Sequence, residues 1–170
     1  MDRTAYRQHH LEFIALIIAI FFIAGCADLP RTPGSFSSNT SQWQGRLALR
    51  VTGAPSQAFS SEFNLQGNAL NGSLTLSTVL GSTLARMQWG PGFATLYTAS
   101  EPTQFESLST LVHHVTGTDI PIDALFRWLR GGNTDTPGWT TDFTNLAQGK
   151  LTARYAAPQG DTELKIVLDR

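Results

Sequence analysis

The sequence is poor in charge and in cysteine. Only 15% of the 170 residues are Asp, Glu, Lys or Arg, whereas about a quarter is usual in soluble domains. The net charge of −1 gives no excess of positive charge for binding a polyanion, so nucleic acid is not an expected partner. Cys26 is the single cysteine, which excludes an intrachain disulfide and a cluster of thiolate metal ligands.

Motifs of common active sites are also missing. The sequence contains no G-x-S-x-G nucleophile elbow, no H-E-x-x-H zinc motif and no phosphate-binding glycine loop. His113 and His114 are adjacent, so on a helix their side chains point about 100° apart and cannot hold one ligand together. We therefore expect neither an enzyme nor a metal or cofactor site.

The longest apolar run is too short to span a membrane. Residues 13–24 read FIALIIAIFFIA and follow a basic start that contains Arg3 and Arg7. A spanning helix needs about 20 residues, whereas a run of about 10–14 is typical of the core of a signal peptide. The N-terminal segment is therefore predicted to be a signal peptide.

The end of this run resembles a bacterial lipobox. Residues 23–26 read IAGC, an aliphatic residue and two small residues before a cysteine. The resemblance implies removal of residues 1–25, acylation of Cys26, and a role for residues 26–42 as the lipidated cysteine and a flexible tether. An ordinary signal peptide, or a short anchor with a chance cysteine, is the alternative.

The residues after Cys26 bear on the destination. In bacterial lipoprotein sorting, an Asp directly after the lipidated cysteine favours retention in the inner membrane. Here Ala27 has that place and Asp28 follows it. The resemblance therefore implies a lipid anchor in the outer membrane, on its periplasmic face.

The rest of the chain has the patterns of strands and of two helices. Apolar and polar residues alternate from Trp43, which is typical of half-buried strands. Apolar residues at helical spacing predict helices over 107–116 and 121–130. The expected strands are 43–51, 59–65, 70–76, 83–89, 93–98, 139–143, 151–156 and 163–168. We predict a mainly β (α+β) fold, an open antiparallel half-barrel with two amphipathic helices covering an apolar concave face.

Several short motifs resemble the outer-membrane lipoprotein receptor family LolB. In chain order, residues 43–47 read WQGRL, 76–83 read LSTVLGST, 121–125 read PIDAL and 128–131 read WLRG. The resemblance covers residues 43–170, which we expect to be the LolB-like lipoprotein-binding domain. It implies an open antiparallel barrel with a helical lid around an apolar cavity. One departure is the brevity of the chain after residue 131, which leaves the closure of the barrel edge and the cavity volume open.

The same resemblance implies a function. The family accepts lipoproteins from a LolA-like periplasmic carrier and inserts their acyl chains into the outer membrane. A hydrophobic residue that protrudes from a loop between two strands is needed for that insertion. The matching residue is Leu80, beside Val79. The pattern alone does not distinguish an exposed Leu80 from one folded into the core, and the resemblance favours exposure.

An apolar cavity for acyl chains would be lined by the inward residues of the strands and covered by the second helix. A filled core would use the same residues, and the two readings differ in whether space is left between them. The expected wall residues are Leu47, Leu49, Phe63, Leu65, Leu74, Leu76, Met87 and Trp89. The expected lid residues are Leu125, Phe126 and Leu129.

Our leading hypothesis is a non-enzymatic, monomeric receptor whose partners are a LolA-like carrier, lipoprotein acyl chains and outer-membrane lipid. A structural lipoprotein, or a scaffold of an envelope assembly without a ligand cavity, is the alternative. A lipid-modifying enzyme is a third hypothesis, but the sequence offers no nucleophile or base beyond scattered Ser and Thr. With no nucleotide-binding motif, transfer would have to run downhill in acyl-chain affinity.

Overall fold

The computed structural model describes residues 41–53, 56–158 and 160–169, which belong to the second of the chain's two units, Ser37–Arg170. The expected signal peptide, Cys26 and most of the expected tether lie outside the described residues. Within them, the elements in chain order are β1 (Gln42–Val51), β2 (Gln57–Gly67), β3 (Gly72–Ser77), β4 (Thr83–Gly90), β5 (Phe93–Tyr97), β6 (Thr103–Phe105), α2 (Leu108–Thr116), α3 (Ile122–Leu129), β7 (Trp139–Asp142), the 3-10 helix η1 (Leu146–Gln148), β8 (Lys150–Tyr155) and β9 (Thr162–Leu168).

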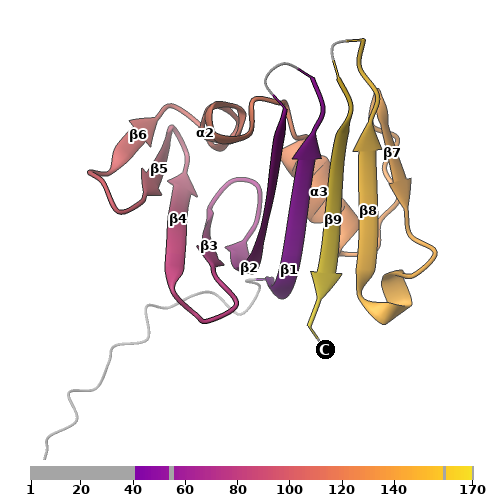
Figure 1. Cartoon of the computed structure of the whole chain (residues 1–170), viewed down its shortest axis with the longest axis horizontal. Coiled ribbons are helices and arrows are strands. Elements are labelled where there is room, and N and C mark those ends of the chain that lie inside the picture. Colours follow the sequence, from indigo (N-terminus) through magenta and orange to yellow (C-terminus); the bar gives the residue numbers. More distant parts are fainter. Residues whose placement is uncertain (1–40, 54–55, 159, 170) are drawn as a thin grey trace, which may run out of the picture. The chain divides into compact units, whose positions relative to one another are not determined.

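All the strands form one antiparallel sheet (Figure 1). In the part of the chain that the structure describes, the sheet has nine strands in the order β6-β5-β4-β3-β2-β1-β9-β8-β7. Neighbouring strands are consecutive in the chain except for β9 and β1, which pair from Gly45 opposite Leu168 to Val51 opposite Thr162. The sheet does not close, since β6 and β7 are its two edges. The predicted mainly β fold with an open sheet and two helices is confirmed.

The backbones of β1 and β9 approach each other closely at Gly45. Gly45 has a φ of +149°, and a Cβ atom at this position would lie 2.0 Å from the carbonyl oxygen of Val167. Only glycine allows the two backbones to approach this closely. Gly45 therefore permits the β1–β9 pairing that joins the two halves of the sheet.

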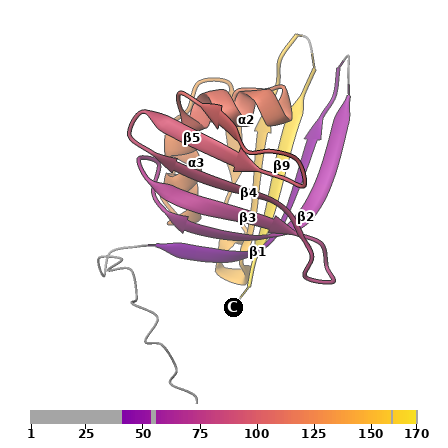
Figure 2. The same ribbon diagram turned by 90° about the vertical axis from the view of Figure 1, so that its left-hand side faces the viewer.

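Both helices lie on the concave side of the curved sheet (Figure 2). Ser107 caps the N-terminus of helix α2, where its Oγ accepts a hydrogen bond from the Thr110 N–H at 3.1 Å. Gly117 caps the C-terminus in the left-handed region, at φ 67°. Helix α3 is flanked by Pro121 and Arg130. The predicted helices thus have the right positions, with bounds that differ by one residue because they included the capping residues.

A row of aromatic side chains holds α3 against the far half of the sheet. Trp128 is fully buried, at 0% exposure. Its ring centroid lies 5.8 Å from that of Trp139, and Trp139 stacks on Tyr155 at 5.5 Å. Because Trp139 is in β7 and Tyr155 in β8, this row fixes the helix to the last strands.

We predict that Trp128→Ala lowers the free energy of unfolding by about 3–5 kcal/mol, the usual cost of removing a buried Trp side chain. The indole N–H has no hydrogen-bond partner among the described residues, so Trp128→Phe should cost clearly less. Urea unfolding followed by fluorescence and circular dichroism measures both. Equal losses in the two variants would contradict the assignment of the stabilisation to ring packing that Phe can partly replace.

Candidate functional site

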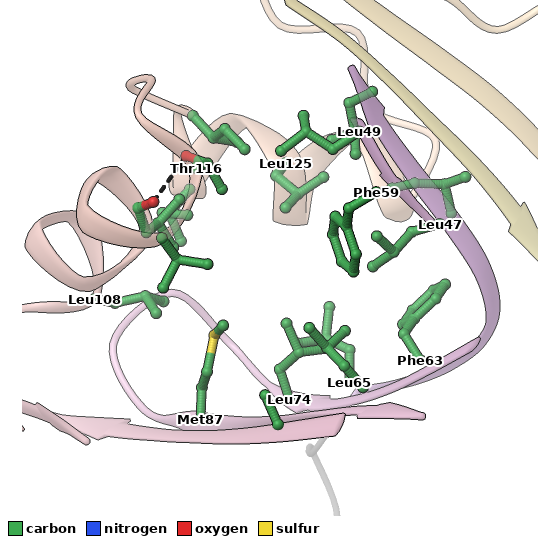
Figure 3. A pocket seen from close by; sticks show the side chains of 18 of the residues that line it. Leu47, Leu49, Phe59, Phe63, Leu65, Leu74, Met87, Leu108, Thr116 and Leu125 are labelled. Carbon is green, nitrogen blue, oxygen red and sulfur yellow. Dashed lines mark hydrogen bonds between the residues drawn. The ribbon is translucent and has the colours of Figure 1, made fainter. Parts of the chain in front are cut away.

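An apolar hollow lies between the concave face of the sheet and the two helices (Figure 3). Its volume is about 430 Å³, within the range of roughly 300–1,000 Å³ that is usual for small-molecule sites. The side chains that line it come from β1 to β5, β9, α2 and α3. Figure 3 shows Leu47, Leu74 and Met87 reaching into it from three different strands.

The chemistry of the lining is almost uniform. Within the described residues, Gln57, Thr98 and Thr116 are its polar members, and no ionisable side chain lines it. The Thr116 hydroxyl is occupied locally, since it donates to the Val112 carbonyl oxygen at 2.7 Å. Such a wall offers dispersion contacts and shelter from water, without groups for acid–base or nucleophilic chemistry.

Every residue predicted to line an acyl cavity is in this lining. The eight strand residues project from β1, β2, β3 and β4, and the three lid residues project from α3. Phe63 and Met87 are buried, at 5% and 4% exposure, yet the hollow remains between them and the helices. The structure thus brings the predicted set together around an open space.

Several lining residues were not predicted. Helix α2 contributes Leu108, Val112 and Val115 to the lining, although the lid was expected from α3 alone. The apolar face of residues 107–116 was the sequence feature that could have identified these three residues as part of the lining. Strand β9 contributes Leu164 and Ile166, which the sequence could not place because their position depends on the pairing of β9 with β1.

Aromatic contacts close one part of the hollow. The ring of Phe126 in α3 lies 5.7 Å from Trp43 and 6.4 Å from Trp89, centroid to centroid. The Trp89 Nε1–H donates to the Asn68 carbonyl oxygen at 2.9 Å, so this indole has a fixed orientation. The three rings join α3 to β1 and β4, and two of them, Phe126 and Trp89, line the hollow.

The hollow opens where its lining residues remain exposed. Phe59 in β2, Leu84 in β4 and Val115 in α2 line it and are also 39%, 47% and 38% exposed. We call these three residues the mouth. Because they are apolar and partly in water, a hydrophobic ligand entering here meets apolar surface first.

The turn between β3 and β4 presents two apolar side chains to solvent, and Figure 2 shows this turn projecting from the sheet. Val79 is 78% exposed and Leu80 is 91% exposed, so neither packs into the core. Two backbone hydrogen bonds form within the turn: the Thr78 N–H donates to the Ser82 carbonyl oxygen at 2.9 Å, and the Gly81 N–H donates to the Thr78 carbonyl oxygen at 2.9 Å. Its backbone is thus held while Leu80 points away.

Charged groups lie on the opposite, outer face of the sheet. Glu163 in β9 accepts from Lys165 at 2.7 Å and from Arg154 at 2.8 Å. The hydrogen bond from Lys165, supported by Arg154, holds the pKa of the Glu163 carboxyl below its ordinary value. On helix α2, His113 Nδ1 lies 2.8 Å from Asp119 Oδ1.

The described part of the chain contains neither a membrane-spanning helix nor a cluster of metal-ligating side chains. Among its helices, none combines the length and apolarity needed to cross a bilayer. No group of three or more His, Cys, Asp or Glu side chains is placed there to hold a metal ion. The apolar hollow and the exposed turn are therefore the features on which a functional argument rests.

Comparison with known proteins agrees with this geometry. The family model described as outer membrane lipoprotein LolB matches residues 39–166. The chain belongs to the LolB family. The region matched by the LolB model contains both the lining of the hollow and the turn with Leu80.

Individual LolB relatives show how far the similarity extends. The outer-membrane lipoprotein LolB of Bordetella petrii is 33% identical over 112 residues, covering 64% of this chain and 56% of the relative. That of Bordetella bronchiseptica is 30% identical over 132 residues, covering 76% and 65%. That of Dechloromonas aromatica is 29% identical over 180 residues, covering 91% and 94%. The chain thus spans 56% of the length of the first relative and 65% of the length of the second.

We predict that Leu74→Trp blocks the hollow. An indole at this position would occupy space that a ligand needs, and displacing a packed ring costs about 1–3 kcal/mol, so the affinity for a neutral apolar dye should fall about tenfold or more. Fluorescence titration with N-phenyl-1-naphthylamine measures this affinity. Leu70→Trp is the matched control, because Leu70 is 73% exposed and is not in the lining. Equal dye binding by both variants would contradict the assignment of the hollow as the ligand site.

Proposed function

We propose that this chain is an outer-membrane lipoprotein receptor, which accepts lipoproteins from a LolA-like periplasmic carrier and inserts their acyl chains into the outer membrane. The observation that carries the proposal is the unfilled apolar hollow of about 430 Å³. Membership of the LolB family and the names of the relatives support it. A scaffold protein would be expected to fill its core, since close-packed interiors are the rule.

The physical task is to keep acyl chains out of water during a handover. Each CH₂ group removed from water contributes roughly 0.8 kcal/mol, so even part of one chain gains substantially from this lining. Binding of this kind needs no covalent step, and we assign no enzymatic activity to the chain. The handover proceeds down a gradient of acyl-chain affinity, from carrier to receptor to bilayer.

In this proposal the N-terminal segment anchors the protein in the outer membrane. Residues 1–25 are removed as a lipoprotein signal peptide, Cys26 carries the acyl chains, and residues 26–42 tether the domain 43–170 to the periplasmic face of the outer membrane. More than one acyl chain makes such an anchor stable. The receptor works as a monomer, because one domain contains the whole hollow and the turn.

The turn at Val79 and Leu80 makes contact with the bilayer. A leucine that is 91% exposed gains free energy when it enters the lipid, since burying such a side chain contributes about 1.5–3 kcal/mol. Because the backbone of the turn is held by its own hydrogen bonds, Leu80 can enter the bilayer without disrupting the pairing of β3 with β4. Insertion of this side chain would bring the hollow next to the membrane that receives the cargo.

We predict that Leu80→Glu leaves the hollow intact and slows delivery about tenfold or more, because the charged side chain removes an apolar insertion worth at least one factor of ten. The assay follows a fluorescent triacylated lipopeptide from a LolA-like carrier into liposomes that contain the full-length protein. Leu70→Glu, on the turn between β2 and β3, is the control. Wild-type delivery by Leu80→Glu would refute the role of the turn, and failure of the unsubstituted protein to take up the lipopeptide would refute the receptor function itself.

A further inference from the structure

The start of β4 breaks the alternation that the rest of the strand obeys. Ala85, Met87 and Trp89 line the hollow, while Arg86 is exposed and places its guanidinium 5.3 Å from the centre of the Tyr97 ring. In a regular strand, successive side chains point to opposite faces. Leu84 should therefore point outward with Arg86, yet it lines the hollow as well.

A β-bulge explains the position of Leu84. Leu76 of β3 pairs with Ala85, and Ser77 pairs with Thr83, so Leu84 has no partner in the ladder and the register shifts between Leu76 and Ser77. An extra residue of this kind bends the strand and turns a side chain to a new direction. The bulge thus moves one leucine from the outer face of the sheet to the mouth.

Leu84 also lies between the mouth and the turn. It is four residues from Leu80, which limits the separation of the two Cα atoms to about 13 Å at the rise of an extended strand. The turn ends at Ser82, whose backbone N–H donates to Thr78 Oγ1 at 3.2 Å. Leu84 is therefore the first residue after the turn that lines the hollow, and Gly81, Ser82 and Thr83 separate it from the exposed Leu80.

We propose that Leu84 is an exit residue, which contacts the acyl chains of a client lipoprotein as they pass from the hollow into the bilayer at the turn. This inference rests on the receptor function proposed above and adds a route and a residue to it. The occupant is an acyl chain, because the described lining contains no charge and four of its exposed members, Ala58, Phe59, Leu84 and Val115, are apolar beside the uncharged Gln57 and Thr98. Each CH₂ that crosses open water slows release by a factor of about four, so an apolar step on the route has a large effect on rate.

A residue that contacts an acyl chain as it leaves the hollow differs from a residue that binds the chain while it rests deep inside, because the first affects the rate of release more than the affinity. Leu84 is 47% exposed, so it contributes little to the equilibrium binding of a ligand held deep in the hollow. It contributes most while a chain is half-way out. Replacement of Leu84 by a polar side chain of similar length should therefore change the rate of delivery much more than the affinity.

The test uses the full-length protein reconstituted in liposomes and three variants, Leu84→Gln, Leu84→Met and the control Leu70→Gln. A fluorescent triacylated lipopeptide is presented as a cyclodextrin complex, and its arrival in the bilayer is followed by energy transfer to a labelled lipid, above the rate with protein-free liposomes. We expect Leu84→Gln to deliver about tenfold more slowly, with a clearly smaller fall in dye affinity for the hollow. Leu84→Met and Leu70→Gln should deliver at the wild-type rate.

Wild-type delivery by Leu84→Gln would overturn the exit role, and so would an equal loss of dye affinity and delivery, which would make Leu84 a residue that binds the chain while it rests inside the hollow. If Leu84→Gln fails to fold, the test uses a variant with a photo-crosslinking amino acid at position 84, which captures any lipopeptide that passes close to it. Capture of the lipopeptide during delivery, with none from position 70, supports the route, and absence of capture refutes it. Failure of the unsubstituted protein to deliver the lipopeptide would instead count against the proposed function, so the two failures are distinguishable.

Discussion

The hollow depends on how α3 is held at both of its sides. Phe126 and Trp128 are two residues apart, about 200° around a helix, and so point in nearly opposite directions. Phe126 packs against Trp43 and Trp89 of the first half of the sheet, and Trp128 packs against Trp139 of the last strands. With both sides anchored, the helix bridges the curved sheet and does not collapse into its concave face.

An open apolar space is expensive for a small domain. If a void of about 430 Å³ were created in a filled core, it would cost on the order of 10 kcal/mol at about 24 cal/mol per Å³. That is comparable to the whole stability of a typical domain, about 5–15 kcal/mol. The fold must obtain its stability elsewhere, from the long antiparallel ladder and the aromatic row, and a use for the space explains why it is kept.

Much of the architecture followed from local patterns. Period-two alternation and helical spacing located most of the strands and both helices, because each element buries one face, and the same alternation identified inward residues such as Phe63 and Met87. The short strand β6 and the 3-10 helix η1 were missed, since three residues are too few for a period to show. The lining contribution of Ile166 depends on a pairing across the whole chain, which no local pattern contains.

Leu84 shows the limit of pattern reasoning most clearly. Alternation along 83–89 assigned Thr83, Ala85, Met87 and Trp89 to one face and would put Leu84 on the other. Only the register of β4 against β3 reveals the extra residue, because a bulge is a property of two strands together. Leu84 therefore reaches the lining because two strands are out of step at this point, and the sequence of β4 alone could not have placed it there.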